Sequence, residues 1–209
     1  MYELGGRMSR PVAKPVRRAD ARQNVEKILE AAIACLGRDP STSAIQIAEC
    51  AGVGRMTLYG HFPSREALVE AALTRLLDKG DQVLEGVDLT GDAPAALCAL
   101  IESSWLLIAQ SSAVLEAAQA TLPPTRVRDL HAKPEQRVNN LIARGQAEGA
   151  FRDDLPRTWL ASVLHYIIKG AATDVASGRL DPTVAPRFIS ETVLAAYAPA
   201  PSEERSTGR

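Results

Sequence analysis

The sequence predicts an all-α protein, with an N-terminal three-helix helix-turn-helix head and a C-terminal helical bundle as its body. Apolar residues recur at intervals of three and four along most of the chain, which is typical of amphipathic helices; the first such series is Val25, Ile28, Leu29, Ala32, Ile33 and Leu36. No segment has the alternating pattern of a β-strand longer than a few residues. With 209 residues, 46% of them hydrophobic, the chain can bury a sizeable core in one or two domains.

Shifts in composition divide the chain into four segments. Residues 1–19 are basic, contain Gly and Pro, and lack apolar periodicity, so we expect a flexible N-terminal arm. Residues 20–66 form the predicted head, residues 67–198 the body and residues 199–209 a polar tail. The first helix is expected to begin after a cap at Asp20, and further helices are expected near 64–85, 95–110, 112–121, 123–131, 134–148, 156–177 and 181–197.

The most informative stretch is SAIQIAECAGVGRMTLYGHF, residues 43–62. Ser43 followed by Gln46 is a capping box, which predicts a helix beginning at Ala44. Gly52 is placed to end that helix in a tight turn, because glycine accepts a positive φ without a steric penalty. Gly54 can then cap a second short helix. Two helices joined by so tight a turn predict a helix-turn-helix.

The second helix of this motif carries the side chains that suit DNA. Leu58 is expected to be buried, which leaves Arg55, Thr57 and Tyr59 outside. In a helix-turn-helix, the N-terminal residues of the second helix meet base edges in the major groove. Arg55 is the residue of this helix that can donate two parallel hydrogen bonds to guanine, so we expect it to dominate specificity.

The run AGVGRMTLYGHFPSREALVEAAL resembles the DNA-binding signature of the TetR/AcrR family of transcriptional regulators. The resemblance covers residues 20–75 by motif. It implies that Tyr59 contacts phosphate and that His61 contacts phosphate or caps the helix. The sequence departs from the family pattern at Gly60 and Met56, which leaves the operator sequence open.

Together these arguments define a set of candidate DNA contacts. Free N–H groups at a helix N-terminus bind phosphate, which adds residues at the beginnings of two helices. The complete set is Thr42, Ser43, Arg55, Met56, Thr57, Tyr59, His61 and Arg65. The expected partner is a double-stranded operator with an inverted repeat, read by a homodimer.

The charge distribution agrees with binding at the N-terminal end. The formal net charge is −1, but residues 1–65 contain ten Lys and Arg against six Asp and Glu, a net of +4. Phosphate neutralisation supplies most non-specific DNA affinity, so the positive end is the one suited to DNA. The basic arm could track phosphates or enter the minor groove, or be a solvated tail.

Other patterns restrict compartment and chemistry. No run of 18 apolar residues, as a membrane span needs, and no apolar signal core is found, so we expect a cytoplasmic protein. Cys35, Cys50 and Cys98 lack metal-binding spacing and are interpreted as buried small residues, with a redox-sensing thiol as the alternative. No catalytic, metal or cofactor motif is present.

The body is expected to bind a small-molecule effector of apolar or mixed character. Candidate cavity residues are Trp105, His131, Trp159, His165 and Tyr166, because ligand pockets are apolar with a few polar groups. The resemblance implies a four-helix dimer interface from residues 156–177 and 181–197. The small-residue face expected there is Ala161, Leu164, Ile168, Ala171, Ala172 and Val175.

The leading interpretation is a homodimeric repressor that a small molecule releases from its operator. Two alternatives stay open at this point. One is a DNA-binding protein without an effector, which would lack a cavity in the body. The other is an all-helical enzyme, which would need a catalytic constellation.

Overall fold

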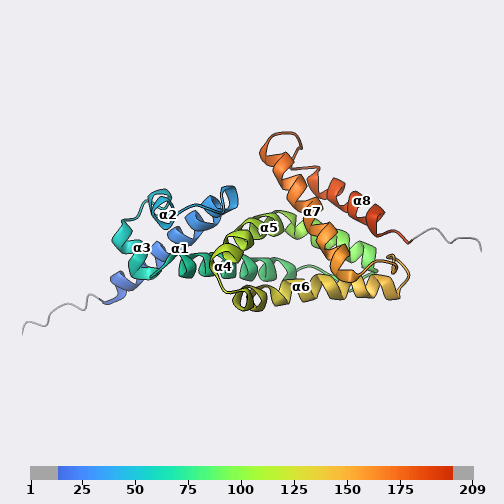
Figure 1. The fold of residues 1–209 in the computed structure, drawn as a ribbon, viewed down its shortest axis with the longest axis horizontal. Helices are drawn as coiled ribbons and strands as arrows, with labels where there is room; N and C mark the ends of the chain where they lie inside the picture. Colours follow the sequence, from blue (N-terminus) through green and yellow to red (C-terminus); the bar gives the residue numbers. More distant parts are fainter. Residues whose placement is uncertain (1–13, 200–209) are drawn as a thin grey trace, which may run out of the picture.

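The computed structural model describes residues 14–199, and every regular element within that range is a helix (Figure 1). The helices in chain order are α1 (Lys14–Arg38), α2 (Ala44–Cys50), α3 (Arg55–His61), α4 (Arg65–Glu85), α5 (Ala93–Thr121), α6 (Pro124–Ala147), α7 (Arg157–Ala176) and α8 (Ala185–Tyr197). The molecule is elongated, with α1 to α3 at one end, α7 and α8 toward the other, and α4 running from the head into the body (Figure 1). The all-α prediction is confirmed.

The first helix begins earlier than expected. It starts at Lys14 and not after a cap at Asp20, so part of the segment predicted as a flexible arm is helical. Pro15 does not prevent this, because it lies in the first helical turn, where its missing N–H would have no partner. Residues 1–13 of the predicted arm and residues 200–209 of the predicted tail lie outside the described residues.

Two predicted breaks within the body are absent. α5 is one helix where two were expected, and within it the hydroxyls of Ser111 and Ser112 donate to carbonyl oxygens one turn back, at 2.7 and 2.9 Å. α6 likewise continues through Pro134. α8 begins at Ala185, a turn later than expected, whereas α4 and α7 agree closely with their predicted ranges.

Two clusters of buried apolar side chains hold the molecule together. The head cluster combines α1 to α4 with the C-terminal part of α5 and the beginning of α6, including Val114 and Val127. The body cluster combines the N-terminal part of α5 with α6, α7 and α8. α5 therefore contributes to both clusters and joins the head to the body.

The expectation that no segment is apolar enough to span a membrane needs correction for α5. α5 contains an 18-residue window of mean hydropathy 1.4, so by length and composition it could cross a membrane. Ten residues of α5 are buried inside the protein, among them Leu97, Ile101 and Val114. The helix packs against α1, α4, α6, α7 and α8. Its apolar character is therefore that of a core helix.

The cysteines do not all match their interpretation as buried residues. Cys35 is buried and Cys98 is half-buried. Cys50 is exposed at the end of α2.

Candidate nucleic-acid interface and body cavity

The turn between α2 and α3 has the local structure that its sequence predicts. Ser43 accepts a hydrogen bond from the backbone N–H of Gln46, and the Gln46 side chain accepts from the backbone N–H of Ser43 at 2.9 Å, which completes the capping box. Gly52 has φ +66°, the left-handed conformation that ends α2. Gly54 is the N-cap of α3. These local contacts fix the direction in which α3 leaves the turn.

α3 presents one face to the core of the head and another to solvent. Leu58 is fully buried, and Phe62, which follows the helix, is 8% exposed. Arg55 and Met56 lie outside, with Met56 84% exposed, while Thr57, Tyr59 and His61 are half-buried. The Arg55 guanidinium lies over the Tyr59 ring, 5.6 Å from its centre. A cation–π contact of this kind holds the arginine near its neighbour without using its hydrogen-bond donors.

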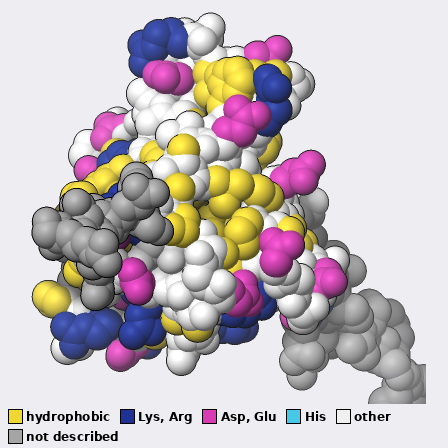
Figure 2. All heavy atoms as spheres, turned by 90° about the vertical axis from the view of Figure 1, so that its right-hand side faces the viewer, with side chains coloured by type: hydrophobic (Ala, Val, Ile, Leu, Met, Phe, Trp, Pro, Cys, Tyr) yellow, Lys and Arg dark blue, Asp and Glu magenta, His cyan; other side chains and the backbone are white. Residues whose placement is uncertain are grey.

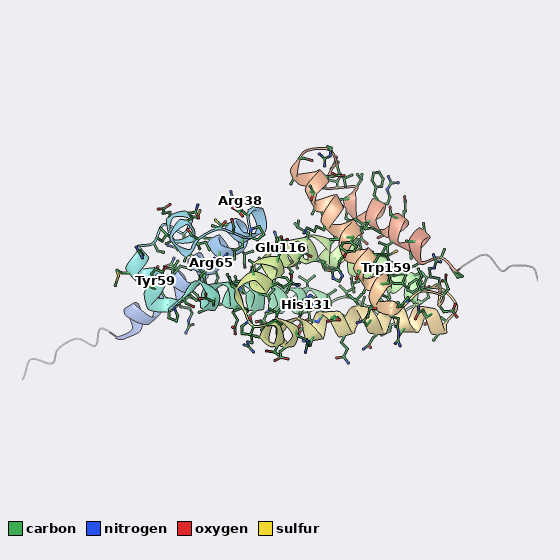
Figure 3. The ribbon with its side chains drawn as sticks, in the orientation of Figure 1. Arg38, Tyr59, Arg65, Glu116, His131 and Trp159 are labelled. Atoms are coloured by element: carbon green, nitrogen blue, oxygen red, sulfur yellow. The ribbon has the colours of Figure 1, made fainter. Side chains whose placement is uncertain are left out.

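Arg65 has a role that sequence reasoning missed. Its Nε donates to the carbonyl oxygen of Thr42 at 3.2 Å, and its Nη2 donates to the carbonyl oxygen of Pro40 at 2.7 Å. The side chain therefore ties the beginning of α4 to the loop before α2 (Figure 3). The Thr42 hydroxyl donates to the carbonyl oxygen of Asp39 at 2.7 Å, so it too stabilises this loop.

The body contains a cavity of about 550 Å³ between α4, α5, α6 and α7. The apolar part of its wall is mostly leucine, and polar side chains come from all four helices. The polar and charged residues are Asp81 from α4; Ser104, Ser111, Ser112, Glu116 and Gln119 from α5; His131 and Arg137 from α6; and Ser162, His165, Tyr166 and Lys169 from α7. The cavity is large enough for a drug-sized molecule.

The structure brings three of the five predicted cavity residues together, namely His131, His165 and Tyr166. The other two predictions are wrong. Trp105 is 7% exposed and belongs to the body core, and Trp159 is 52% exposed on α7, away from the cavity wall (Figure 3). Helical periodicity groups residues that share a face, but it does not say which face the cavity adjoins.

The charged groups of the cavity wall are paired. Asp81 accepts from Lys133 and from Arg137 at 2.5 Å each. Burial raises the pKa of Asp81, but the hydrogen bonds from Lys133 and Arg137 and their positive charges outweigh this effect, so the pKa lies below its ordinary value. Glu116 of α5 pairs with Lys169 of α7 at 3.1 Å.

Two histidines face each other across the cavity, with ring centres 6.5 Å apart. Nδ1 of His165 lies 2.7 Å from the carbonyl oxygen of Ala161. Burial lowers the pKa of His131, and the nearby His165 lowers it further, while the negative charge of Glu135 acts against them. His131 is therefore neutral near pH 7.

The inward and outward faces of α7 differ from the expected ones. Ala161, Leu164 and Ile168 are buried in the chain's own body core, and Ala171, Ala172 and Val175 pack against that core. Ala161, Leu164 and Ile168 are therefore not available to a partner, whereas Ala171, Ala172 and Val175 are only partly buried. The outer side of α7 and α8 instead exposes Trp159, Tyr166 and Phe188, by 52%, 67% and 43%. Hydrophobic side chains also lie open at the body end of the molecule (Figure 2).

The head is similar to a known family of bacterial regulatory proteins. The family model described as "Bacterial regulatory proteins, tetR family" matches residues 28–72, which span the end of α1, the helix-turn-helix and the beginning of α4. The head of this chain is therefore similar to that of the TetR family. The HTH-type transcriptional repressor LfrR of Mycolicibacterium smegmatis is 33% identical over 94 residues, which are 44% of this chain and 50% of the repressor. The match thus spans half the length of that curated relative. These similarities support a DNA-binding regulator.

Solved structures share the whole fold. The TetR-like regulator LfrR from Mycobacterium smegmatis, in complex with proflavine, has a TM-score of 0.67 at 23% identity, over 83% of this chain and 96% of LfrR. A TetR family regulator from Agrobacterium tumefaciens has a TM-score of 0.63 at 18% identity, over 85% of this chain and 99% of the other. MbdR from Azoarcus sp. CIB has a TM-score of 0.61 at 21% identity, over 82% and 97%. The TetR fold therefore includes the body as well as the head.

Proposed function

We propose that this protein is a cytoplasmic, homodimeric repressor of the TetR family, released from an inverted-repeat operator when a small molecule fills the body cavity. One observation carries the proposal. The first half of α4 is buried in the head cluster through Leu68, Val69 and Leu73, and its second half lines the cavity through Gly80, Asp81 and Leu84. A ligand that moves the cavity wall would therefore move a helix that shares the head cluster with Leu58 of the recognition helix.

DNA recognition is assigned to the exposed side of α3 and to the loops beside it. Arg55 is proposed to read guanine, and Thr57 to contact both base and phosphate. Tyr59 and His61 would contact phosphate, and Met56, which is fully outside, would lie against the bases. Thr42, Ser43 and Arg65 would position the head on the backbone, which fixes register without reading sequence.

Dimerisation is assigned to the outer side of α7 and α8. Trp159, Tyr166 and Gly170 recur at helical spacing on the exposed side of α7. Phe188 extends the apolar surface on α8. Exposed aromatic residues are rare on a monomer unless they serve an interface, and aromatic side chains are enriched at interface cores. Two copies joined there would carry two heads to successive half-sites.

Effector binding is assigned to the cavity between α4 and α7. The similar regulator LfrR was solved in complex with proflavine. The apolar wall and the paired charges of the present cavity favour an apolar or mixed ligand. A cavity of about 550 Å³ also argues against the alternative of a DNA-binding protein without an effector. The similarity of the head to the TetR family favours a regulator over an all-helical enzyme.

The mechanism requires different effector affinities in the DNA-bound and released states. A coupling free energy of about 1–3 kcal/mol would weaken operator binding roughly 5- to 150-fold. Ion pairs between α4 and α6 supply the connection. Glu70 of α4 pairs with Arg126 of α6 at 2.5 Å, and Asp81 of α4 pairs with Lys133 and Arg137 of α6. α4 and α6 are thus held together beside both the head and the cavity.

The test is a footprint of the protein on the DNA that flanks its own gene, repeated with ligands found by a thermal-shift screen. We expect protection of an inverted repeat, lost at saturating concentrations of at least one stabilising ligand. Ligands that stabilise the protein but leave the footprint unchanged would contradict the regulatory role of the cavity. Absence of any protected site would contradict the choice of operator location.

A further inference from the structure

We propose that the cavity recognises a neutral ligand with an aromatic body and a phenolic hydroxyl, held between His165 and His131. The inference rests on the proposed function only in taking the cavity as a ligand site. It concerns which ligand chemistry the site selects, and it can be tested without DNA.

The tautomer of His165 is fixed by the backbone. Its Nδ1 lies 2.7 Å from the carbonyl oxygen of Ala161, and a carbonyl can only accept, so Nδ1 must carry the proton. When Nδ1 carries the only ring proton, Nε2 has a free lone pair on the ring edge away from that carbonyl. Because His165 lines the cavity, a ligand must offer a hydrogen-bond donor to use this acceptor.

His131 supplies the complementary group. Its ring centre is 6.5 Å from that of His165, with the ring planes tilted by 54°, so the two rings are close enough for one ligand group to contact both. Burial lowers the pKa of His131, and the nearby His165 lowers it further, against the negative charge of Glu135. The neutral ring of His131 has one N–H donor and one acceptor nitrogen. A hydroxyl is both donor and acceptor, so it can donate to His165 and accept from His131.

The remaining charged groups argue against an ionic ligand. From α4 the cavity faces Asp81, which is bridged to Lys133 and Arg137 of α6. From α5 it faces Glu116, which pairs with Lys169 of α7. Each carboxylate already has a basic partner, so neither a cation nor an anion would find an uncompensated charge. The leucines of α4 and α5, among them Leu76, Leu100 and Leu107, would surround the ring.

The pH dependence follows from the same geometry. Protonation of His131 places a positive charge beside an apolar ligand. Because burial lowers the pKa of His131, the ligand should bind best at and above neutral pH and more weakly as the pH falls through that pKa. Asp81 stays ionised in this range, because the hydrogen bonds from Lys133 and Arg137 outweigh burial and hold its pKa below the ordinary value.

The experiment measures binding of 1-naphthol, 1-methoxynaphthalene, naphthalene and 1-naphthoate to the full chain by titration calorimetry. Near pH 7.5 we expect 1-naphthol to bind about fivefold more tightly than the methyl ether, because the ether oxygen can still accept from His131 but cannot donate to His165, which removes one net hydrogen bond. Near pH 5.5 the 1-naphthol affinity should fall several-fold, with that of naphthalene unchanged.

In the His165→Phe variant the preference for 1-naphthol should vanish while naphthalene still binds, which shows that the variant is folded. Glu102→Gln, at an exposed position of α5 outside the cavity wall, is the control and should change nothing.

Four outcomes would overturn the inference. They are equal affinities for 1-naphthol and its methyl ether, a naphthol preference that survives in His165→Phe, tighter binding of 1-naphthoate than of 1-naphthol, and no binding of any probe at its solubility limit. Tight, pH-dependent binding of 1-naphthol that leaves operator affinity unchanged would instead uphold the inference and contradict the proposed regulatory function.

Discussion

Arg65 donates from Nε to the carbonyl oxygen of Thr42 at 3.2 Å, across 23 positions of the sequence. The contact joins the first residue of α4 to the residue before the N-cap of α2. With the second bond to Pro40, it fixes the helix that reaches the cavity against the loop beside the recognition motif. A side chain predicted to contact phosphate thus also holds the head in shape.

Replacing Arg65 should separate these two roles. Arg65→Ala removes two charge-assisted hydrogen bonds to half-buried carbonyls, so the free energy of unfolding should fall by about 1–3 kcal/mol in urea denaturation. Arg65→Lys keeps the charge but not the planar fork, and should recover most of the salt-dependent DNA affinity without recovering the stability. If Arg65→Ala loses DNA affinity at unchanged stability, the contacts to Thr42 and Pro40 are not energetically important.

Arg55→Ala should act on specificity and not on stability, because Arg55 is exposed on α3. If it reads a guanine, operator binding should weaken by about 1–3 kcal/mol while binding to random duplexes changes little. Competition binding with both DNAs gives the measurement. Equal losses on operator and random DNA would reassign Arg55 to phosphate and leave discrimination to Thr57 and Met56.

The local part of this architecture could be predicted from sequence because its determinants are neighbours. The capping pair Ser43 and Gln46, the positive φ of Gly52 and the cap at Gly54 all act within a few residues. The contacts between distant helices could not be predicted in the same way. Nothing in the local sequence places Arg65 against Thr42, or shows that a Cβ on Gly145 would lie 2.1 Å from the Phe151 ring.

The same difference between local and long-range determinants separates the two candidate sites. The recognition residues of α3 follow from helical spacing within seven residues, whereas the cavity depends on how four helices pack. Periodicity therefore placed both tryptophans in the cavity, although Trp105 faces the core and Trp159 faces solvent. It also missed Asp81 and its partners Lys133 and Arg137, which lie more than 50 residues away along the chain.

Gly170→Glu should split the dimer without unfolding the protomer. A Cβ at Gly170 meets nothing within 4 Å of the chain's own atoms, and glutamate has a higher helix propensity than glycine. A buried charge on each side of a two-fold interface would oppose association. Light scattering should show a monomer for this variant and a dimer for Ala132→Glu, an exposed control on α6. A monomeric wild type, or a variant that stays dimeric, would contradict the assignment of this surface.

His131 should reduce stability in acid. Its folded-state pKa lies below the ordinary value of 6.5, chiefly because of burial, so the unfolded chain takes up the proton first as the pH falls. The stability that the neutral ring contributes is full above pH 6.5 and is lost as the pH falls from there through the folded-state pKa. His131→Phe should flatten the decline of the unfolding free energy in this window. An identical decline in both proteins would show that His131 does not titrate as described.

The central claim is that the head of this protein reads a duplex by neutralising phosphates and contacting bases. It is tested most directly by selecting duplexes from a random library and measuring affinity for the enriched sequence at increasing salt. The account predicts an enriched inverted repeat, bound by a dimer, with log K falling steeply and linearly with log salt concentration. Binding that does not depend on salt, or a library from which no inverted repeat is enriched, would contradict it.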